Sequence, residues 1–334
     1  MTEPPSRLFA MLRRLGLMAE DETPRIAPLL GGVSSDIWRI DLEHQAICVK
    51  RALPKLKVAA DWRVPVERNA YEVSWIETAG KIVPEAVPRL LAHDPEAGLF
   101  VMEFLDPARY HLWKEQLRRG VTDPAVARAV GDRLVRIHAA TAGDPRVAAR
   151  FSTDDIFRAI RLEPYLEAAA RAHPDRGARL SELVEITAST RRALVHGDVS
   201  PKNILVGPRG PVFLDAECAW YGDPAFDLAF CANHFLLKCL WTPTAARGFL
   251  DCFGAMVETY RSGVSWEPAQ SVETRAARLL PGLLLARVDG KSPVEYLVEE
   301  RDKDRVREVA RALLAEPADT LAAVRHAWAE EIGI

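Results

Sequence analysis

Apolar and polar residues alternate over residues 35–42 and again over residues 46–50, with a short polar stretch between them. Strict alternation is typical of a strand with one buried face, so the pattern predicts a hairpin. Apolar residues then recur at helical spacing over residues 66–79. Pro65 precedes this stretch and Gly80 follows it, and we expect a helix between them because proline starts and glycine ends many helices.

The rest of the pattern divides the chain into two parts. Strands are expected over residues 88–93 and 99–104, which complete a small antiparallel sheet. Helical spacing then dominates, with helices expected at residues 125–140, 156–172, 180–192, 226–240, 245–260 and beyond 270. A β-rich patch interrupts these helices at residues 203–206 and 212–215.

A chain of 334 residues exceeds the usual size of one hydrophobic core. We therefore expect an α+β protein of two lobes. The first, residues 1–105, holds an N-terminal helix, the sheet and one further helix, and the second, residues 106–334, is larger and mostly helical.

Charge and cysteine content narrow the function classes. The formal net charge is −3, without a long run of one sign, so the footprint of a nucleic-acid polymer binder is missing. The five cysteines form no C-x-x-C pair, which favours buried thiols in a reducing compartment. Arg13 and Arg14 interrupt the first apolar stretch, and no stretch is long enough to span a membrane. We expect a cytoplasmic protein without a membrane partner.

The β-rich patch carries a set of residues suited to phosphoryl transfer. His196-Gly197-Asp198 is followed by Asn203, and the next strand leads to Asp215. A carboxylate can accept the proton of an attacking hydroxyl, while an amide and a second carboxylate hold Mg²⁺ against a triphosphate. Asp198 alone would suit an ordinary turn, but the full spacing favours a catalytic loop that uses Mg²⁺ and ATP.

The remaining parts of an ATP site are expected upstream. Small residues before the hairpin would let backbone N–H groups approach phosphates: Gly31, Gly32, Ser34 and Ser35. Lys50 ends the second strand, where a lysine can bridge phosphates and pair with a helix glutamate. Glu67 and Glu72 compete for that pairing, because residues five apart on a helix point about 140° apart. We favour Glu72.

These motifs resemble the aminoglycoside phosphotransferase and choline kinase-like family, which includes methylthioribose kinase and fructosamine kinase. The resemblance rests on the segments 196–203, 214–217 and 222–229, with support from 101–104 and 136–139. It implies a protein-kinase-like fold. It also implies that Asp198 is the base, Asn203 and Asp215 are the Mg²⁺ ligands, Lys50 contacts phosphate, Asp227 braces the loop, and the Glu103 carbonyl and Leu105 N–H meet adenine.

The chain departs from the protein kinases within the same family of folds. Gly197 replaces the arginine of H-R-D, and Ala216-Glu217 replaces the end of D-F-G. Only about a dozen residues separate Asp215 from Asp227, too few for the segment that holds a peptide substrate. We therefore expect a small-molecule acceptor: a sugar, amino alcohol, hydroxy acid or aminoglycoside-like compound. A silent nucleotide-binding scaffold is the competing hypothesis.

Three residues are candidates for the acceptor side. Glu217 could support the metal or the acceptor, or pair with a surface arginine. Arg287 and Lys291 lie near the end of a late helix and would favour a carboxylate or phosphate on the acceptor, or would simply cap that helix. The sequence specifies neither the acceptor nor the oligomeric state.

Overall fold

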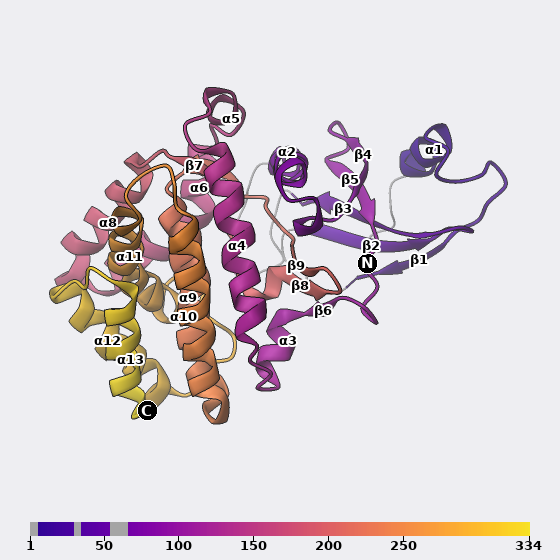
Figure 1. The fold of residues 1–334 in the computed structure, drawn as a ribbon. Helices are drawn as coiled ribbons and strands as arrows, with labels where there is room; N and C mark the ends of the chain where they lie inside the picture. Colours follow the sequence, from indigo (N-terminus) through magenta and orange to yellow (C-terminus); the bar gives the residue numbers. More distant parts are fainter. Residues whose placement is uncertain (1–5, 30–34, 54–65) are drawn as a thin grey trace.

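The computed structural model describes residues 6–29, 35–53 and 66–334, which form two lobes (Figure 1). The smaller lobe contains an antiparallel sheet whose strands lie in the order β1-β2-β3-β5-β4. Its strands are β1 (Arg25–Pro28), β2 (Ser35–Asp41), β3 (Ala46–Ala52), β4 (Leu90–Asp94) and β5 (Leu99–Glu103). The predicted hairpin is confirmed as β2 and β3, in a register that places Ile37 opposite Lys50.

The two faces of this sheet have different neighbours. Helix α1 (Ser6–Arg14) packs on the face that carries Val49 and Val101, where its apolar residues form one core cluster with the strands. Helix α2 (Arg68–Ile82) belongs to the main core cluster together with Phe100 of β5. Because successive side chains of a strand point to opposite faces, Lys50 follows Val49 onto the side of α2.

Helix α2 extends further than its sequence signals indicate. It begins at Arg68 and continues through Gly80 to Ile82, so the prediction that Gly80 ends the helix is wrong. A Cβ at Gly80 would lie 3.1 Å from Cγ2 of Val87. The glycine therefore allows close packing against the following segment rather than termination.

The larger lobe is mostly helical, as expected. Its helices are α3 (Trp113–Arg118), α4 (Pro124–Thr141), α5 (Pro145–Arg150), α6 (Asp154–Phe157), a π-helical segment (Arg158–Glu167), α7 (Ala168–Ala172), α8 (Gly177–Ser189), α9 (Pro224–Trp241), α10 (Ala246–Gly263), α11 (Ala269–Asp289), α12 (Glu300–Ala315) and α13 (Leu321–Ile332). No helix in the described part of the chain is both long and apolar enough to cross a membrane.

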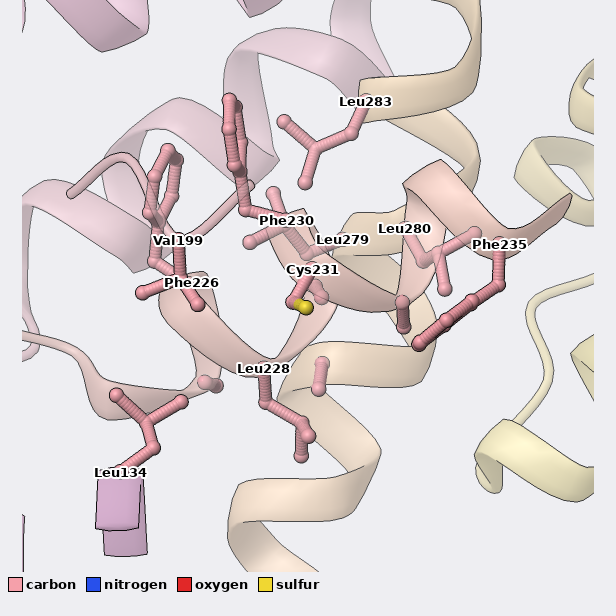
Figure 2. Close-up of a cluster of buried hydrophobic side chains, with 14 of the residues drawn as sticks. Leu134, Val199, Phe226, Leu228, Phe230, Cys231, Phe235, Leu279, Leu280 and Leu283 are labelled. Atoms are coloured by element: carbon pink, nitrogen blue, oxygen red, sulfur yellow. The ribbon is translucent and has the colours of Figure 1, made fainter. Parts of the chain in front are cut away.

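Helix α9 is the centre of the larger lobe. Every residue from Pro224 to Leu240 is buried, so the helix is enclosed on all sides. Phe226, Phe230 and Phe235 pack there with leucines of α11 (Figure 2). Because α9 is packed on all sides, its first turn holds Asp227 in a fixed position next to the segment 196–203.

The predicted helix over residues 156–172 is divided into three pieces. Its middle, Arg158–Glu167, is π-helical and contains Pro164, which has no backbone N–H to donate. Wider helical turns of this type occur frequently at functional sites. This one carries Arg161.

The larger lobe contains two small sheets, and the first of them holds the predicted β-rich patch, whose second strand ends at Phe213 rather than at Asp215. Strand β8 (Ile204–Gly207) pairs with β9 (Gly210–Phe213) and with β6 (His111–Leu112). Strand β7 (Ala193–Val195) pairs with β10 (Trp220–Gly222). The sheet of the smaller lobe ends with β5 at Glu103, while β6 already joins the second lobe. A domain boundary at residues 105/106 stays a prediction.

All five cysteines are free and buried. Cys48 lies in β3 of the smaller lobe. The others lie in the larger lobe: Cys218, Cys231, Cys239 and Cys252.

Candidate active site

The loop between β7 and β8 carries Asp198 and depends on a glycine before it. Gly197 has a φ of +79°, and a Cβ there would lie 2.8 Å from the carbonyl oxygen of Cys218. A side chain would clash with this backbone atom and would be strained at that φ. The glycine in place of the kinase arginine is therefore a requirement of this loop.

Asp227 at the start of α9 fixes the backbone of the same loop. Its carboxylate accepts hydrogen bonds from the N–H groups of His196 (2.7 Å) and Gly197 (2.8 Å). His138 of α4 lies 3.3 Å from the same carboxylate through Nε2 and 2.8 Å from the Tyr260 hydroxyl through Nδ1. The residues of this network are fully buried, and their hydrogen bonds hold the backbone of the loop in place.

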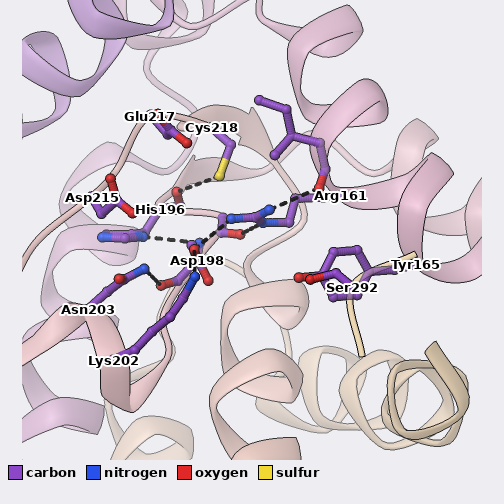
Figure 3. A network of polar contacts seen from close by, with 12 residues as sticks. Arg161, Tyr165, His196, Asp198, Lys202, Asn203, Asp215, Glu217, Cys218 and Ser292 are labelled. Atoms are coloured by element: carbon purple, nitrogen blue, oxygen red, sulfur yellow. Dashed lines mark hydrogen bonds and ion pairs between the residues drawn. The ribbon is translucent and has the colours of Figure 1, made fainter. Parts of the chain in front are cut away.

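Asp198 is buried beside two cations (Figure 3). Its Oδ2 lies 2.8 Å from Nη2 of Arg161 and 3.3 Å from Nζ of Lys202. Burial alone would raise the pKa of Asp198, but Arg161 and Lys202 outweigh burial and lower it well below its ordinary value. The carboxylate is therefore ionised near neutral pH.

The structure brings Asn203 and Asp215 together next to Asp198. The Leu214 N–H donates to the Asn203 carbonyl (2.8 Å), and Asn203 Nδ2 donates to the Asp198 carbonyl (3.1 Å). Asp215 has a φ of 68°, the one positive φ of a non-glycine residue in the described chain. Such a backbone is held in place by its surroundings and is common at functional sites.

The donor set fits a magnesium ion bound together with a nucleotide. Asn203 Oδ1 and the Asp215 carboxylate are hard oxygen ligands, and Mg²⁺ commonly takes one or two protein oxygens plus phosphates and water. Residues 6–29, 35–53 and 66–334 contain no cluster of three His, Cys, Asp or Glu side chains suited to a metal.

Lys50 connects the two lobes through carboxylates. Its Nζ donates to both oxygens of Glu72 (2.8 and 2.6 Å) and to Oδ1 of Asp215. Glu67 is exposed instead, so Glu72 is the glutamate that meets the lysine. Burial lowers the pKa of Lys50, but Asp215 and Glu72 outweigh burial and raise it above its ordinary value. The ammonium is charged and held where the lobes meet.

Glu217 contacts a buried arginine rather than a surface one. Nε of Arg68 donates to its Oε2 at 2.9 Å, and Arg68 is fully buried on α2. The alternative that Glu217 pairs with a surface arginine is therefore wrong, because the arginine that it contacts is buried. Glu217 thus forms an ion pair with α2, in addition to the ion pair that Asp215 forms with Lys50 of β3.

The other nucleotide-side candidates are only partly covered. Gly31, Gly32 and Ser34 lie outside the described residues, and Ser35 is buried at the start of β2. Glu103 ends β5, and its side chain accepts from the Arg89 N–H at 2.8 Å. Among the residues that the structure describes, no hydrogen bond engages the Leu105 N–H.

The two acceptor-side cations have separate environments. Arg287 is buried, and its Nη1 donates to the Tyr165 hydroxyl (3.3 Å) and to the Ser292 hydroxyl (3.1 Å) and carbonyl. Lys291 is half exposed and pairs with Glu163 at 2.6 Å. After Asp289 the helix ends and Lys291 turns to the surface, so the two side chains do not lie together. That either residue contacts the acceptor stays a prediction.

Sequence reasoning missed Arg161 and Lys202, which contact Asp198, and Arg68, which contacts Glu217. Lys202 is one residue before Asn203, so its position in the motif could have found it. Arg161 gives no such signal, because its segment reads as an ordinary helix and only the π-helical turn and tertiary packing aim it at the loop.

Comparison with known proteins gives the fold and the family. The chain is 24% identical to a methylthioribose kinase from Bacillus cereus over 80% of this chain and 79% of that protein. It is 24% identical to a methylthioribose kinase from Yersinia pseudotuberculosis over 60% of this chain, spanning 55% of that relative's length.

Two solved structures show the two-lobed, protein-kinase-like fold. One is an ethanolamine kinase from Plasmodium vivax, with a TM-score of 0.56, 13% identity, and coverage of 93% and 88% of the two chains. The other is an amicoumacin kinase in complex with AMP-PNP, Ca²⁺ and Ami, with a TM-score of 0.51, 14% identity, and coverage of 94% and 95%. The model of the phosphotransferase enzyme family, APH, matches residues 25–259, more than half of the chain. The chain therefore belongs to the phosphotransferase enzyme family, in agreement with the motifs around Asp198.

Proposed function

We propose that this protein is a Mg²⁺·ATP-dependent kinase that transfers the γ-phosphoryl group to a hydroxyl of a small molecule. One observation carries the proposal: residues from both lobes converge on Asp215. Lys50 reaches it from β3, and Asn203 and Asp198 adjoin it from the loop after β7. A phosphoryl-transfer site needs this combination of a cation, two metal-binding oxygens and a separate carboxylate.

Each residue has a defined task in the transfer. Lys50, oriented by Glu72, contacts the phosphates, and the backbone near Glu103 and Leu105 meets adenine. Asn203 and Asp215 would hold Mg²⁺, which would supply positive charge against the phosphates. Asp198 orients the acceptor hydroxyl and takes its proton as the new O–P bond forms and ADP leaves. The products are ADP, a phosphate monoester and a proton.

Nucleotide binding and turnover test the proposal separately. Calorimetry should show ATP binding that requires Mg²⁺, and ADP release should depend on an added alcohol from a panel of sugars, amino alcohols, hydroxy acids and aminoglycosides. Methylthioribose belongs in the panel because relatives carry that name. Absence of Mg²⁺-dependent ATP binding by folded protein would refute the proposal. Binding without turnover on any acceptor would favour the silent scaffold.

A further inference from the structure

Arg287 and Lys238, two buried cations in the larger lobe, lack a carboxylate partner among the described residues. Arg287 is 7% exposed and Lys238 of α9 is 1% exposed, and neither forms an ion pair within the described ranges of the chain. The hydrogen-bond partners of Arg287 are neutral groups of Tyr165 and Ser292. Buried charged groups are normally paired, because removing an unpaired charge from water is unfavourable. An arginine stays protonated in proteins, so it cannot become neutral when it is buried. Among the described residues, no anionic group therefore neutralises Arg287 or Lys238.

Aromatic rings connect these cations to the catalytic loop. The Arg161 guanidinium, which holds Asp198, lies 5.8 Å from the ring centroid of Tyr165 and 5.7 Å from that of Phe230. The Arg287 guanidinium lies 5.6 Å from the same Tyr165 ring. One tyrosine thus contacts the arginine next to Asp198 and the arginine that lacks an anion.

Helix α9 continues this series of contacts from Phe230 to Lys238. Phe230, His234 and Lys238 are spaced four residues apart and so lie on one face of the helix. The rings of Phe230 and His234 are 5.6 Å apart, and Lys238 Nζ lies 4.6 Å from the ring centroids of both Trp241 and Tyr296. We call Arg287, His234 and Lys238 the cationic row. His234 itself is neutral, because burial and the two neighbouring cations lower its pKa well below the ordinary value.

The cationic row also contains buried nitrogen atoms that have no hydrogen-bond partner among the described residues. His234 is 5% exposed, and its Nε2, like Nε of Arg287, has no hydrogen-bond partner among the described residues. Buried donors are hydrogen-bonded in the great majority of cases. Three carboxylates act on the row from nearby: Asp198, held by Arg161, Glu295, paired with Lys114, and Glu115, paired with Arg118. All three have other partners.

We propose that the cationic row binds a carboxylate or phosphate group of the acceptor whose hydroxyl lies against Asp198. The inference rests on the proposed kinase function and narrows its substrate class to hydroxylated anions. Phe230 and Lys238 are two helical turns apart, so the anionic group lies on the order of 12 Å or less from the Arg161 end of the row. Polycationic aminoglycosides and quaternary amino alcohols would place a cation against Arg287 and are disfavoured.

Inorganic phosphate and acetate serve as probes, with AMP-PNP and Mg²⁺ present to occupy the nucleotide site. Each variant's thermal unfolding is measured with and without the anion. At least one anion should raise the melting temperature of the wild type, and the rise should be lost in Arg287→Met. Lys291→Met is the matched control: it removes a neighbouring cation that pairs with Glu163 at the surface, and it should respond like the wild type. The phosphate and acetate arms show which anion the row prefers.

Paired acceptors give the catalytic readout. D-Ribose 5-phosphate is compared with D-ribose, and D-glycerate with glycerol. The preferred anionic compound should exceed its neutral partner in kcat/KM by about tenfold or more, and Arg287→Met should abolish that preference while KM for ATP stays unchanged. If Arg287→Met does not fold, Lys238→Met replaces it.

No stabilisation of the wild type by either anion, or equal stabilisation of the variant, would overturn the inference. So would a neutral compound that matches or exceeds its anionic partner. Loss of Mg²⁺-dependent AMP-PNP binding in the wild type would instead contradict the kinase function itself.

Discussion

Arg161 holds the carboxylate of Asp198 through an Nη2–Oδ2 contact of 2.8 Å, and both residues are less than a tenth exposed. The arginine comes from the π-helical segment and the aspartate from the loop after β7. Nε of Arg161 also donates to the carbonyl of Gly197, the residue before Asp198. One side chain thus fixes both the backbone and the charge of the proposed base.

Arg161→Met should shift the pH dependence of turnover. Burial raises the pKa of Asp198, and Arg161 is the first cation that opposes it, so the pKa must rise when Arg161 is removed. Asp198 acts as a carboxylate, so activity is lost as pH falls through that pKa. We expect the acidic limb of the kcat profile to move to higher pH, and Arg161→Lys to restore it in part.

The control for this experiment is Arg158→Met. Arg158 is in the same segment but pairs with Glu167 at 2.9 Å and is half exposed. An Arg161→Met profile that coincides with that of Arg158→Met would show that Arg161 has only a structural role.

Asp198→Asn and Asp215→Ala should have different effects. Asp198→Asn should leave the Kd for Mg·ATP nearly unchanged but lower kcat by about 10²–10⁴-fold, because proton acceptance matters in the transition state. Asp215→Ala should in addition weaken Mg²⁺-dependent nucleotide binding, because the residue is a proposed metal ligand. Wild-type turnover by Asp198→Asn would exclude Asp198 as the base.

The Arg68–Glu217 ion pair should contribute strongly to stability. Arg68→Met leaves the buried Glu217 carboxylate without this partner, and we expect a loss of about 3–5 kcal/mol in the free energy of unfolding in urea. The double variant Arg68→Met/Glu217→Gln should recover part of the loss. Arg150→Met, which breaks a half-exposed pair with Glu77, should cost only about 0–1 kcal/mol. Equal effects of the two single variants would contradict this prediction.

Lys238→Met should stabilise the ligand-free protein. Burial, with Lys114 and Arg287 adding to it, lowers the pKa of Lys238 from 10.5 to about 7. Between those pH values the unfolded chain binds a proton that the folded chain does not, so wild-type stability rises with pH. The variant lacks this penalty and should gain on the order of 1–3 kcal/mol near pH 7, an advantage that fades towards pH 10.

Unfolding in urea at pH 7 and pH 9.5 checks the prediction. A variant that is less stable than the wild type at pH 7 would show that the Lys238 ammonium is not a burden on the folded state. Under the proposal for the cationic row, the same substitution should weaken anion binding, so stability and binding should change in opposite directions.

Local pattern was sufficient where one periodicity dominated. The alternation around Lys50 predicted the hairpin, and the H-x-D-x-x-x-x-N spacing placed Asp198 and Asn203 on one short loop, because strands β7 and β8 flank it directly. Helical geometry showed that only one of Glu67 and Glu72 could face Lys50, but it did not decide between them. These are relationships between residues close in the chain or on one element.

Relationships across elements could not be predicted in this way. The π-helical turn that aims Arg161 at Asp198 leaves the apolar spacing of a helix almost unchanged, so the sequence suggests one continuous helix. Gly80 resembles a helix end, but close contact with Val87 explains it.

The burial of every cysteine has a practical consequence for thiol chemistry. Burial raises the pKa of Cys48, Cys239 and Cys252 to about 12 and raises that of the other two further, so almost no thiolate forms near neutral pH. Alkylating reagents should therefore modify the chain only when a lobe opens. Because Cys48 is alone in the smaller lobe, the order in which the thiols are modified reports which lobe opens first.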